Sequence, residues 1–251
     1  MPRPRTIRVP ARARRAAHLL PVPAPMNDHD SPRLIADIGG TYARFTLETA
    51  PGAYRHAASL RCAEHADFHA AVTAYLAGLP PGLAGAIEHA AIAIANPVEG
   101  DEVRMTNYTW RFSIEQERQR LKLATLVVVN DFTALALALP RLGAADRWQL
   151  GGDAPEPGTA IGLIGPGTGL GMSGLLPDGR GGWLPIQGEG GHGTLGATTA
   201  REAAVLDVLR DWHGHVSAER AVCGQGLVDI HSALQQLDDA PGAQLPAAAI
   251  T

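Results

Sequence analysis

Residues 124–139, ATLVVVNDFTALALAL, decide the fold class of this 251-residue chain. Ala124–Val129 is a continuous apolar run rich in valine, which predicts a buried strand of a parallel sheet. Thr133–Leu139 is rich in alanine and leucine and predicts a helix directly after that strand. Asn130 and Asp131 would then lie at the C-terminal end of a buried strand, where ligands and catalytic groups collect in α/β folds.

The rest of the chain alternates between similar strand and helix patterns, so the predicted class is α/β. Arg33–Ile38 and Ala43–Glu48 are expected to form a hairpin around Gly39-Gly40-Thr41, and Ser113 is expected to cap a helix that ends near Leu121. Further strands are predicted at Tyr54–Leu60, Ala90–Ala95, Ala160–Ile164 (buried) and Trp183–Gln187, and helices at His65–Leu76, Thr199–Trp212, from Ser217, and at Gly226–Leu237.

Composition restricts the class of protein. Hydrophobic residues make up 45% of the chain and charged residues 18%, which predicts a packed globular core. The net charge of −4 lacks the basic footprint of a protein that binds nucleic acid or an anionic membrane surface. No apolar run reaches the roughly 18 residues of a membrane-spanning helix. Cys62 and Cys223 form no CxxC pair, so neither a disulfide framework nor a zinc site is expected. We expect both to be reduced thiols of a cytoplasmic protein.

The first 32 residues are rich in arginine and proline and have no acidic residue before Asp28. A transit peptide or a twin-arginine signal at Arg14-Arg15 would explain the arginines, but prolines interrupt the apolar region that such a signal needs. We therefore expect residues 1–32 to be a disordered extension, or the product of an upstream start codon with Met26 as the true first residue.

Two glycine clusters, Asp37–Thr41 and Gly165–Gly171, each follow a predicted strand. Glycine lets successive backbone N–H groups approach an anion closely, so both clusters are candidates for phosphate binding. No Gly-Lys-Ser/Thr follows either cluster and neither fits GxGxxG, which argues against a Walker A loop and a Rossmann site. Structural hairpins are the alternative.

Asp131 is a candidate general base for transfer of a phosphoryl group to an alcohol, and the alternative is that it caps the helix that follows. Asn130 offers a donor and an acceptor to sugar hydroxyls. Glu189 and His192, in a glycine-rich turn, have the carboxylate and imidazole groups that suit a hexose. Glu219 is expected in the first turn of a helix, where an acidic residue is favoured in any case.

Taken together, these motifs resemble the bacterial glucokinase family, within the hexokinase and actin-like ATPase superfamily. The matching stretches occur in the family's order from about Arg33 to Thr251: Leu34–Arg44, Ala95–Val98, Met105–Trp110, Val129–Ala134, Gly165–Gly171, Gly188–His192, His215–Arg220 and Gly224–Leu227.

The resemblance implies an ATP-dependent glucokinase that forms glucose 6-phosphate in the first step of glycolysis. It implies that Asp131 is the base for the sugar 6-hydroxyl and that Asn130, Glu189, His192 and Glu219 bind the hexose. It further implies that Asp37 lies near the Mg²⁺ of MgATP. The nucleotide-binding positions carried over are Ala36, Asp37, Ile38, Gly39, Gly40, Thr41, Gly165, Gly167, Thr168 and Gly169. The partners implied are D-glucose and MgATP, with no nucleic acid or membrane, in a homodimer when full length.

The implied fold is a two-domain, ribonuclease-H-like α/β fold. Residues 33–140 would form the small domain and residues 141–251 part of the large one. The sequence departs from the family in two places. Tyr42 stands where family members commonly have Asn, and the chain ends at Thr251 where the family continues, so we expect an incomplete large domain and a chain that is poorly stable or weakly active.

Three other functions stay open. A kinase for another hexose would use the same residues, and a sugar-binding remnant without catalysis would keep only the sugar-binding set. A transcriptional regulator related to sugar kinases would need an N-terminal helix-turn-helix, for which residues 1–32 are short and rich in proline.

Overall fold

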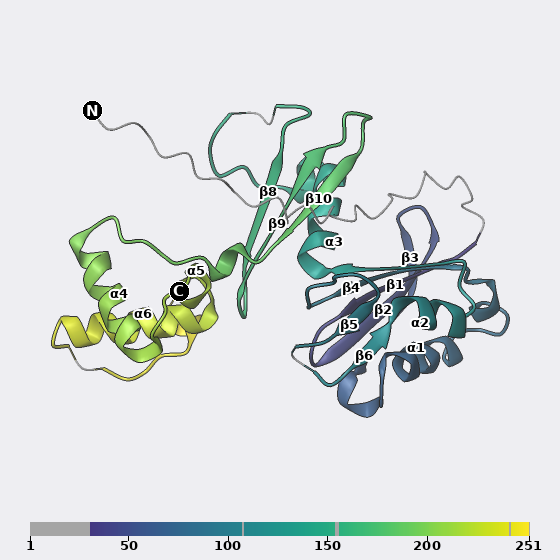
Figure 1. The fold of residues 1–251 in the computed structure, drawn as a ribbon, viewed down its shortest axis with the longest axis horizontal. Helices are drawn as coiled ribbons and strands as arrows, with labels where there is room; N and C mark the ends of the chain where they lie inside the picture. Colours follow the sequence, from purple (N-terminus) through teal and green to yellow (C-terminus); the bar gives the residue numbers. More distant parts are fainter. Residues whose placement is uncertain (1–30, 107, 154–155, 241, 251) are drawn as a thin grey trace, which may run out of the picture.

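The structure, a computed structural model, describes residues 31–106, 108–153, 156–240 and 242–250. Figure 1 shows an α/β unit, a separate small sheet above it and a lobe of helices on the opposite side. Nearly all of the predicted N-terminal extension lies outside the described residues.

The strands are β1 (Arg33–Ile38), β2 (Tyr42–Ala50), β3 (Ala53–Arg61), β4 (His89–Ile94), β5 (Glu102–Arg104), β6 (Arg111–Ser113), β7 (Thr125–Asn130), β8 (Ile161–Pro166), β9 (Leu170–Pro177) and β10 (Trp183–Gly188). The α-helices are α1 (Phe68–Ala77), α2 (Ile114–Arg120), α3 (Asp131–Ala138), α4 (Ala200–His213), α5 (Ala218–Ala221), α6 (Gly224–Leu237) and α7 (Ala247–Ile250).

The larger sheet has the strand order β3-β2-β1-β4-β7. β1 pairs antiparallel with β2, which confirms the hairpin around Gly39-Gly40-Thr41. β1, β4 and β7 run parallel to one another. The parallel strand predicted at Ala124–Val129 is therefore confirmed as β7, but it lies at the edge of the sheet and is not buried throughout, since only Leu126 and Val128 are buried. β7 runs directly into α3, as the valine and alanine-leucine segments predict.

The core of this unit lies between one face of the sheet and helices α1 and α2. Alternate residues of β1, namely Leu34, Ala36 and Ile38, point into it. Phe68 of α1 and Trp110 join them there and are almost fully buried. The helix predicted at His65–Leu76 begins later, at Phe68, because Asp67 accepts a hydrogen bond from the backbone N–H of Ala70 and caps it. Ser113 caps α2 as predicted, through the N–H of Gln116.

The smaller sheet has the order β10-β9-β8 and is antiparallel throughout. The prediction of a buried strand at Ala160–Ile164 is wrong: no residue of β8 is buried, and Ile164 is 62% exposed. An apolar run is compatible with a buried strand but does not require one, because burial depends on what packs against it. Helix α3 packs against β8, β9 and β10 of the smaller sheet, and it also contacts strands of the larger sheet.

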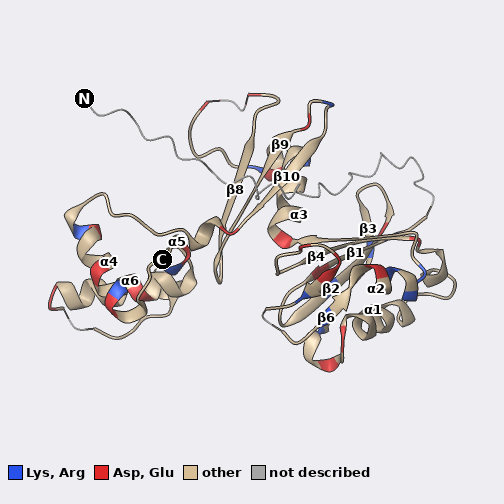
Figure 2. Cartoon of the chain, viewed as in Figure 1, with Lys and Arg blue, Asp and Glu red and all other residues tan. Residues whose placement is uncertain are grey.

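Helices α4 and α6 pack together around a second hydrophobic cluster of Val205, Leu206, Val208, Leu209, Val216 and Ala233. Thr199 caps α4, and Glu202 completes a capping box with it. Ser217 caps α5 through the N–H of Arg220, and α6 begins at Gly224, two residues earlier than predicted. Within the described residues, no helix is long and apolar enough to cross a membrane. Acidic and basic residues are scattered over both helical and sheet regions (Figure 2).

Candidate active site

The first glycine turn joins β1 to β2. The N–H of Gly39 donates to the carbonyl of Tyr42 across 2.9 Å, and two contacts from Cys62 brace the turn. The N–H of Cys62 reaches the carbonyl of Thr41 at 2.9 Å, and its thiol reaches the carbonyl of Gly39 at 3.4 Å. Among the residues that the structure describes, the N–H groups of Gly40 and Thr41 have no acceptor within the chain. Such amides can bind an anion, as the sequence predicts.

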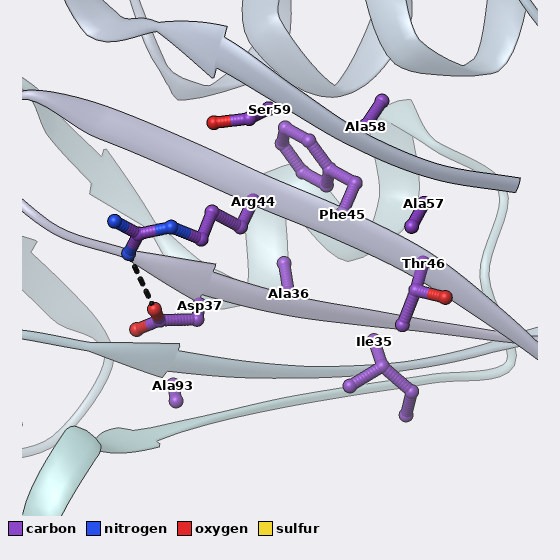
Figure 3. A pocket seen from close by; sticks show the side chains of 10 residues that line it. All are labelled: Ile35, Ala36, Asp37, Arg44, Phe45, Thr46, Ala57, Ala58, Ser59 and Ala93. Carbon is purple, nitrogen blue, oxygen red and sulfur yellow. Dashed lines mark hydrogen bonds and ion pairs between the residues drawn. The ribbon is translucent and has the colours of Figure 1, made fainter. Parts of the chain in front are cut away.

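Asp37 lies at the end of β1, beside this turn. Its carboxylate is 53% exposed and accepts a hydrogen bond of 2.9 Å from the guanidinium of Arg44, on β2. Both side chains face a hollow of about 560 Å³ on the uncovered face of the sheet (Figure 3). Its lining residues are Ile35, Ala36, Asp37, Arg44, Phe45, Thr46, Ala57, Ala58, Ser59 and Ala93. Among the predicted nucleotide-binding residues, Ala36 and Ile38 are buried in the core, and Ala36 also lines the hollow.

Asn130, and not Asp131, caps helix α3. Its side-chain oxygen accepts from the N–H groups of Phe132 (3.0 Å) and Thr133 (3.2 Å). Its amide nitrogen donates to Asp131 Oδ1 (2.9 Å) and to the carbonyl of Asn96 (3.3 Å). The alternative that Asp131 is a cap is therefore wrong. The Asn130 amide is engaged within the chain at both ends, and in this conformation it orients Asp131.

Asp131 occupies the first position of α3, where the parallel strands of the large sheet end. Burial raises the pKa of Asp131 above the usual 3.8, and the negative charge of Asp37 raises it further. Hydrogen bonds from the Phe132 N–H, at 2.8 Å, and from Asn130 oppose that rise in pKa. A carboxyl group whose charged form is partly disfavoured is a better proton acceptor than a free aspartate.

The second glycine turn joins β8 to β9. The N–H of Gly167 closes the turn onto the carbonyl of Gly169 at 2.8 Å, and the N–H of Gly224, at the start of α6, donates to the carbonyl of Gly167 at 3.0 Å. In the part of the chain that is described, the N–H groups of Thr168 and Gly169 are left without an acceptor. This turn therefore presents a second pair of amides of the kind that bind phosphate.

Glu189, His192 and Glu219 lie together, next to the second turn. His192 Nε2 is 3.5 Å from Glu189 Oε2, and His192 Nδ1 is 3.9 Å from Glu219 Oε1. The other oxygen of Glu219 accepts from the N–H of Leu170 at 2.9 Å. A Cβ at Gly169 would overlap that carboxylate, so glycine is required there for Glu219 to approach the turn. Two carboxylates and an imidazole at this spacing suit a ligand that carries several hydroxyl groups.

The predicted site residues thus form two groups. Asp37, Asn130 and Asp131 lie at the end of the large sheet, and Glu189, His192 and Glu219 lie beside the second glycine turn. Among the described residues, no hydrogen bond or ion pair joins Asp131 to Glu189, His192 or Glu219.

Asn96 and Tyr42, which are outside the predicted set of site residues, also shape the site. Asn96 is buried and holds Asn130 through its carbonyl, while its side chain binds the N–H of Thr106 at 2.9 Å. Asn96 lies in the stretch Ala95–Val98 that resembles the family, but nothing in the sequence indicated this contact. Tyr42 lies close to two guanidinium groups, with Arg44 at 6.0 Å and Arg61 at 5.9 Å from its ring centre. These cations add positive charge beside the first turn, which favours an anion there.

Comparison with known proteins places the chain in a family. A sequence model of the glucokinase family matches residues 34–251. The glucokinase of Aromatoleum aromaticum is 56% identical over 220 residues, which cover 86% of this chain and 65% of that protein. The glucokinase of Chromobacterium violaceum is 48% identical over 220 residues, covering 88% of this chain and 62% of that protein. The chain thus spans less than two thirds of the length of these relatives.

Solved structures agree with this assignment. The crystal structure of a glucokinase from an Antarctic psychrotroph superposes with a TM-score of 0.76 at 31% identity, covering 87% of this chain and 68% of that one. A glucokinase of the ROK family from Streptomyces griseus, solved with glucose and AMPPNP, shares the fold at a TM-score of 0.52 and 21% identity. The predicted α/β, actin-like ATPase fold is therefore confirmed, with only part of it present. Since the family match extends over residues 34–251, the chain belongs to the glucokinase family.

Proposed function

We propose that this chain carries the general base, the hexose-binding residues and two phosphate-binding turns of an ATP-dependent glucokinase. The reaction is transfer of the γ-phosphoryl group of ATP to the 6-hydroxyl of D-glucose. The observation that carries the proposal is Asp131, a partly desolvated carboxylate oriented by Asn130 at the end of the parallel strands.

In this mechanism, Asp131 accepts the proton of the sugar hydroxyl as that oxygen attacks phosphorus. The transition state of phosphoryl transfer is loose, so the protein contributes mainly through position and charge. Glu189, His192 and Glu219 orient the sugar ring. The N–H pairs of Gly40 and Thr41 and of Thr168 and Gly169 hold phosphate oxygens. Arg44 and Arg61 lie beside the ring of Tyr42, the residue that follows the first pair, and their positive charge would favour an anion there.

Mg²⁺ suits the residues present. It prefers one or two carboxylates together with water and substrate phosphates over a cage made only of protein ligands. Asp37 provides such a carboxylate, and its exposed ion pair with Arg44 is weak enough to exchange for a hydrated ion. No group of three or more His, Cys, Asp or Glu in the described residues could hold a metal by itself, which fits an ion that arrives with ATP. When bound, Mg²⁺ would neutralise charge on the phosphate oxygens.

A second candidate is sugar binding without catalysis. It is favoured by the direct contacts among Glu189, His192 and Glu219, and by the absence of any bond from these to Asp131 among the described residues. A kinase for mannose, fructose or an N-acetylhexosamine is a variant of the main proposal. The domain division near residue 140, a homodimer in the longer protein and a cytoplasmic location belong to the same proposal.

The deciding experiment measures ADP release in a coupled assay with a panel of hexoses, alongside calorimetry with glucose and with MgATP separately. The proposal predicts turnover that is fastest with glucose, and binding of both ligands. Glucose binding without MgATP binding or turnover would support the second candidate. Absence of glucose binding by a folded chain would contradict both.

A further inference from the structure

Two glycines of the second turn segment, Gly165 and Gly171, lie opposite each other in the β8–β9 ladder. The ring of Phe132 lies across this pair. A Cβ built on Gly165 would be 2.7 Å from Cε1 and Cζ of the ring. A Cβ built on Gly171 would overlap Cδ2, Cε2 and Cζ of the same ring. Because neither glycine has a side chain, the pair leaves a slot on the hairpin, and the ring of Phe132 from α3 fills it.

Phosphate binding does not account for glycine at these two positions. The free amides of the turn belong to Thr168 and Gly169, at its tip, whereas Gly165 and Gly171 lie in the strands on either side. At Gly167, by contrast, a Cβ would meet no atom within 4 Å. The requirement at Gly165 and Gly171 is thus for space, and the space is taken by Phe132.

Phe132 also contacts the proposed base. It follows Asp131 in the chain, and its N–H donates to Asp131 Oδ1 at 2.8 Å and to Asn130 Oδ1 at 3.0 Å. One residue therefore contacts the glycine pair through its ring and the Asp131 carboxylate through its backbone. This is a continuous path between the two groups of site residues, which no direct hydrogen bond connects in the described part of the chain.

We propose that Phe132 is a positioning residue that seats α3 on the Gly165–Gly171 pair and so holds Asp131 in register with the second phosphate-binding turn. This inference rests on the proposed function. Misplacement of a catalytic group by about 1 Å can cost on the order of 10²-fold in rate. The fit of the ring in its slot therefore bears on turnover through the position of Asp131.

The test compares Gly171→Ala with Gly162→Ala, a matched change in the same hairpin where a Cβ would meet no atom within 4 Å. The first measurement is hydrogen exchange at the Phe132 and Thr133 amides, the second kcat and KM for glucose. Gly171→Ala is expected to speed exchange at these amides and to lower kcat by roughly 10²-fold, with a smaller change in KM. Gly162→Ala is expected to leave both near the parent values.

A double variant tests the contact itself. Phe132→Ala empties the slot, so adding Gly171→Ala to it should cause little further loss, whereas independent sites would add. If Gly171→Ala does not fold, Gly165→Ala and Phe132→Leu give milder forms of the same comparison. Additive losses, or exchange at Phe132 and Thr133 that is the same in the Gly171 and Gly162 variants, would overturn the inference. If the parent chain phosphorylates no hexose, the proposed function fails, and the exchange measurements still decide whether the hairpin controls the start of α3.

Discussion

At the scale of single residues, the raised pKa of Asp131 links activity to stability. Because the folded chain binds this proton more tightly than the unfolded chain, the carboxyl group costs stability as pH rises from its ordinary pKa to its folded pKa. That cost is fully present at pH values above the folded pKa. Asp131→Asn removes the charge but keeps an oxygen that can accept from the Phe132 N–H.

We therefore expect Asp131→Asn to lower kcat by roughly 10²–10⁴-fold, the usual effect of losing a general base. The melting temperature at pH 7 should be unchanged or higher, and the difference from the parent should vanish at pH values below the ordinary aspartate range. A coupled ADP assay measures the turnover, and thermal melts across the acid range measure the stability difference on either side of the ordinary aspartate pKa of 3.8. Near-normal turnover in the variant would remove Asp131 from the role of base.

At the scale of elements, the cap of α3 controls the same carboxylate. Asn130→Asp keeps the oxygens that accept from Phe132 and Thr133, so the cap survives. It replaces a donor to Asp131 with a second negative charge, which raises the pKa of Asp131 further. The acid limb of the kcat/KM profile should move to higher pH. Ser113→Ala, which removes the cap of the distant α2, should cost about 1 kcal/mol without moving that limb.

Helices α1 and α2 are joined by a buried carboxylate. Glu117 is almost fully buried and binds His69 Nδ1 and the Arg120 guanidinium, each at 2.7 Å. Glu117→Ala removes both of these contacts, and because the partner side chains are partly exposed, 24% for His69 and 53% for Arg120, we expect a loss of about 1–3 kcal/mol in the free energy of unfolding. Glu115→Ala, on the exposed face of the same helix, should change it little. Denaturant titration compares them, and equal losses would contradict a special role for Glu117.

At the scale of the whole molecule, two hydrophobic clusters lie far apart in the sequence and in Figure 1. The segment between them includes the highly exposed Trp148 and Leu150 and strand β8, none of whose residues is buried, so few buried side chains connect the two clusters beyond the contact of α3 with the smaller sheet. We expect calorimetry to show two unfolding transitions. Leu34→Ala and Leu209→Ala, which truncate equally buried leucines of the two clusters, should each cost about 2–5 kcal/mol and lower a different transition. One transition that both variants shift equally would contradict this expectation.

The sequence by itself determined the order and type of most elements and the position of Asp131. Periodicity, turn glycines and capping residues such as Ser113 act within a few residues, so they can be read from one stretch of chain. The glycine turns and the acidic and imidazole groups beside them were recognisable for the same reason.

Only the tertiary structure decided which residues touch. Asn130 caps α3, and its amide nitrogen donates to the carbonyl of Asn96, 34 positions away, a contact that no local pattern specifies. β8 is exposed although its sequence is apolar, since burial depends on neighbours that no local pattern specifies. Glycine at 165 and 171 looks like phosphate chemistry in the sequence, but in the fold it makes room for the ring of Phe132. Each of these contacts joins residues far apart in the chain, and their spacing in space arises only when the sheets and helices pack.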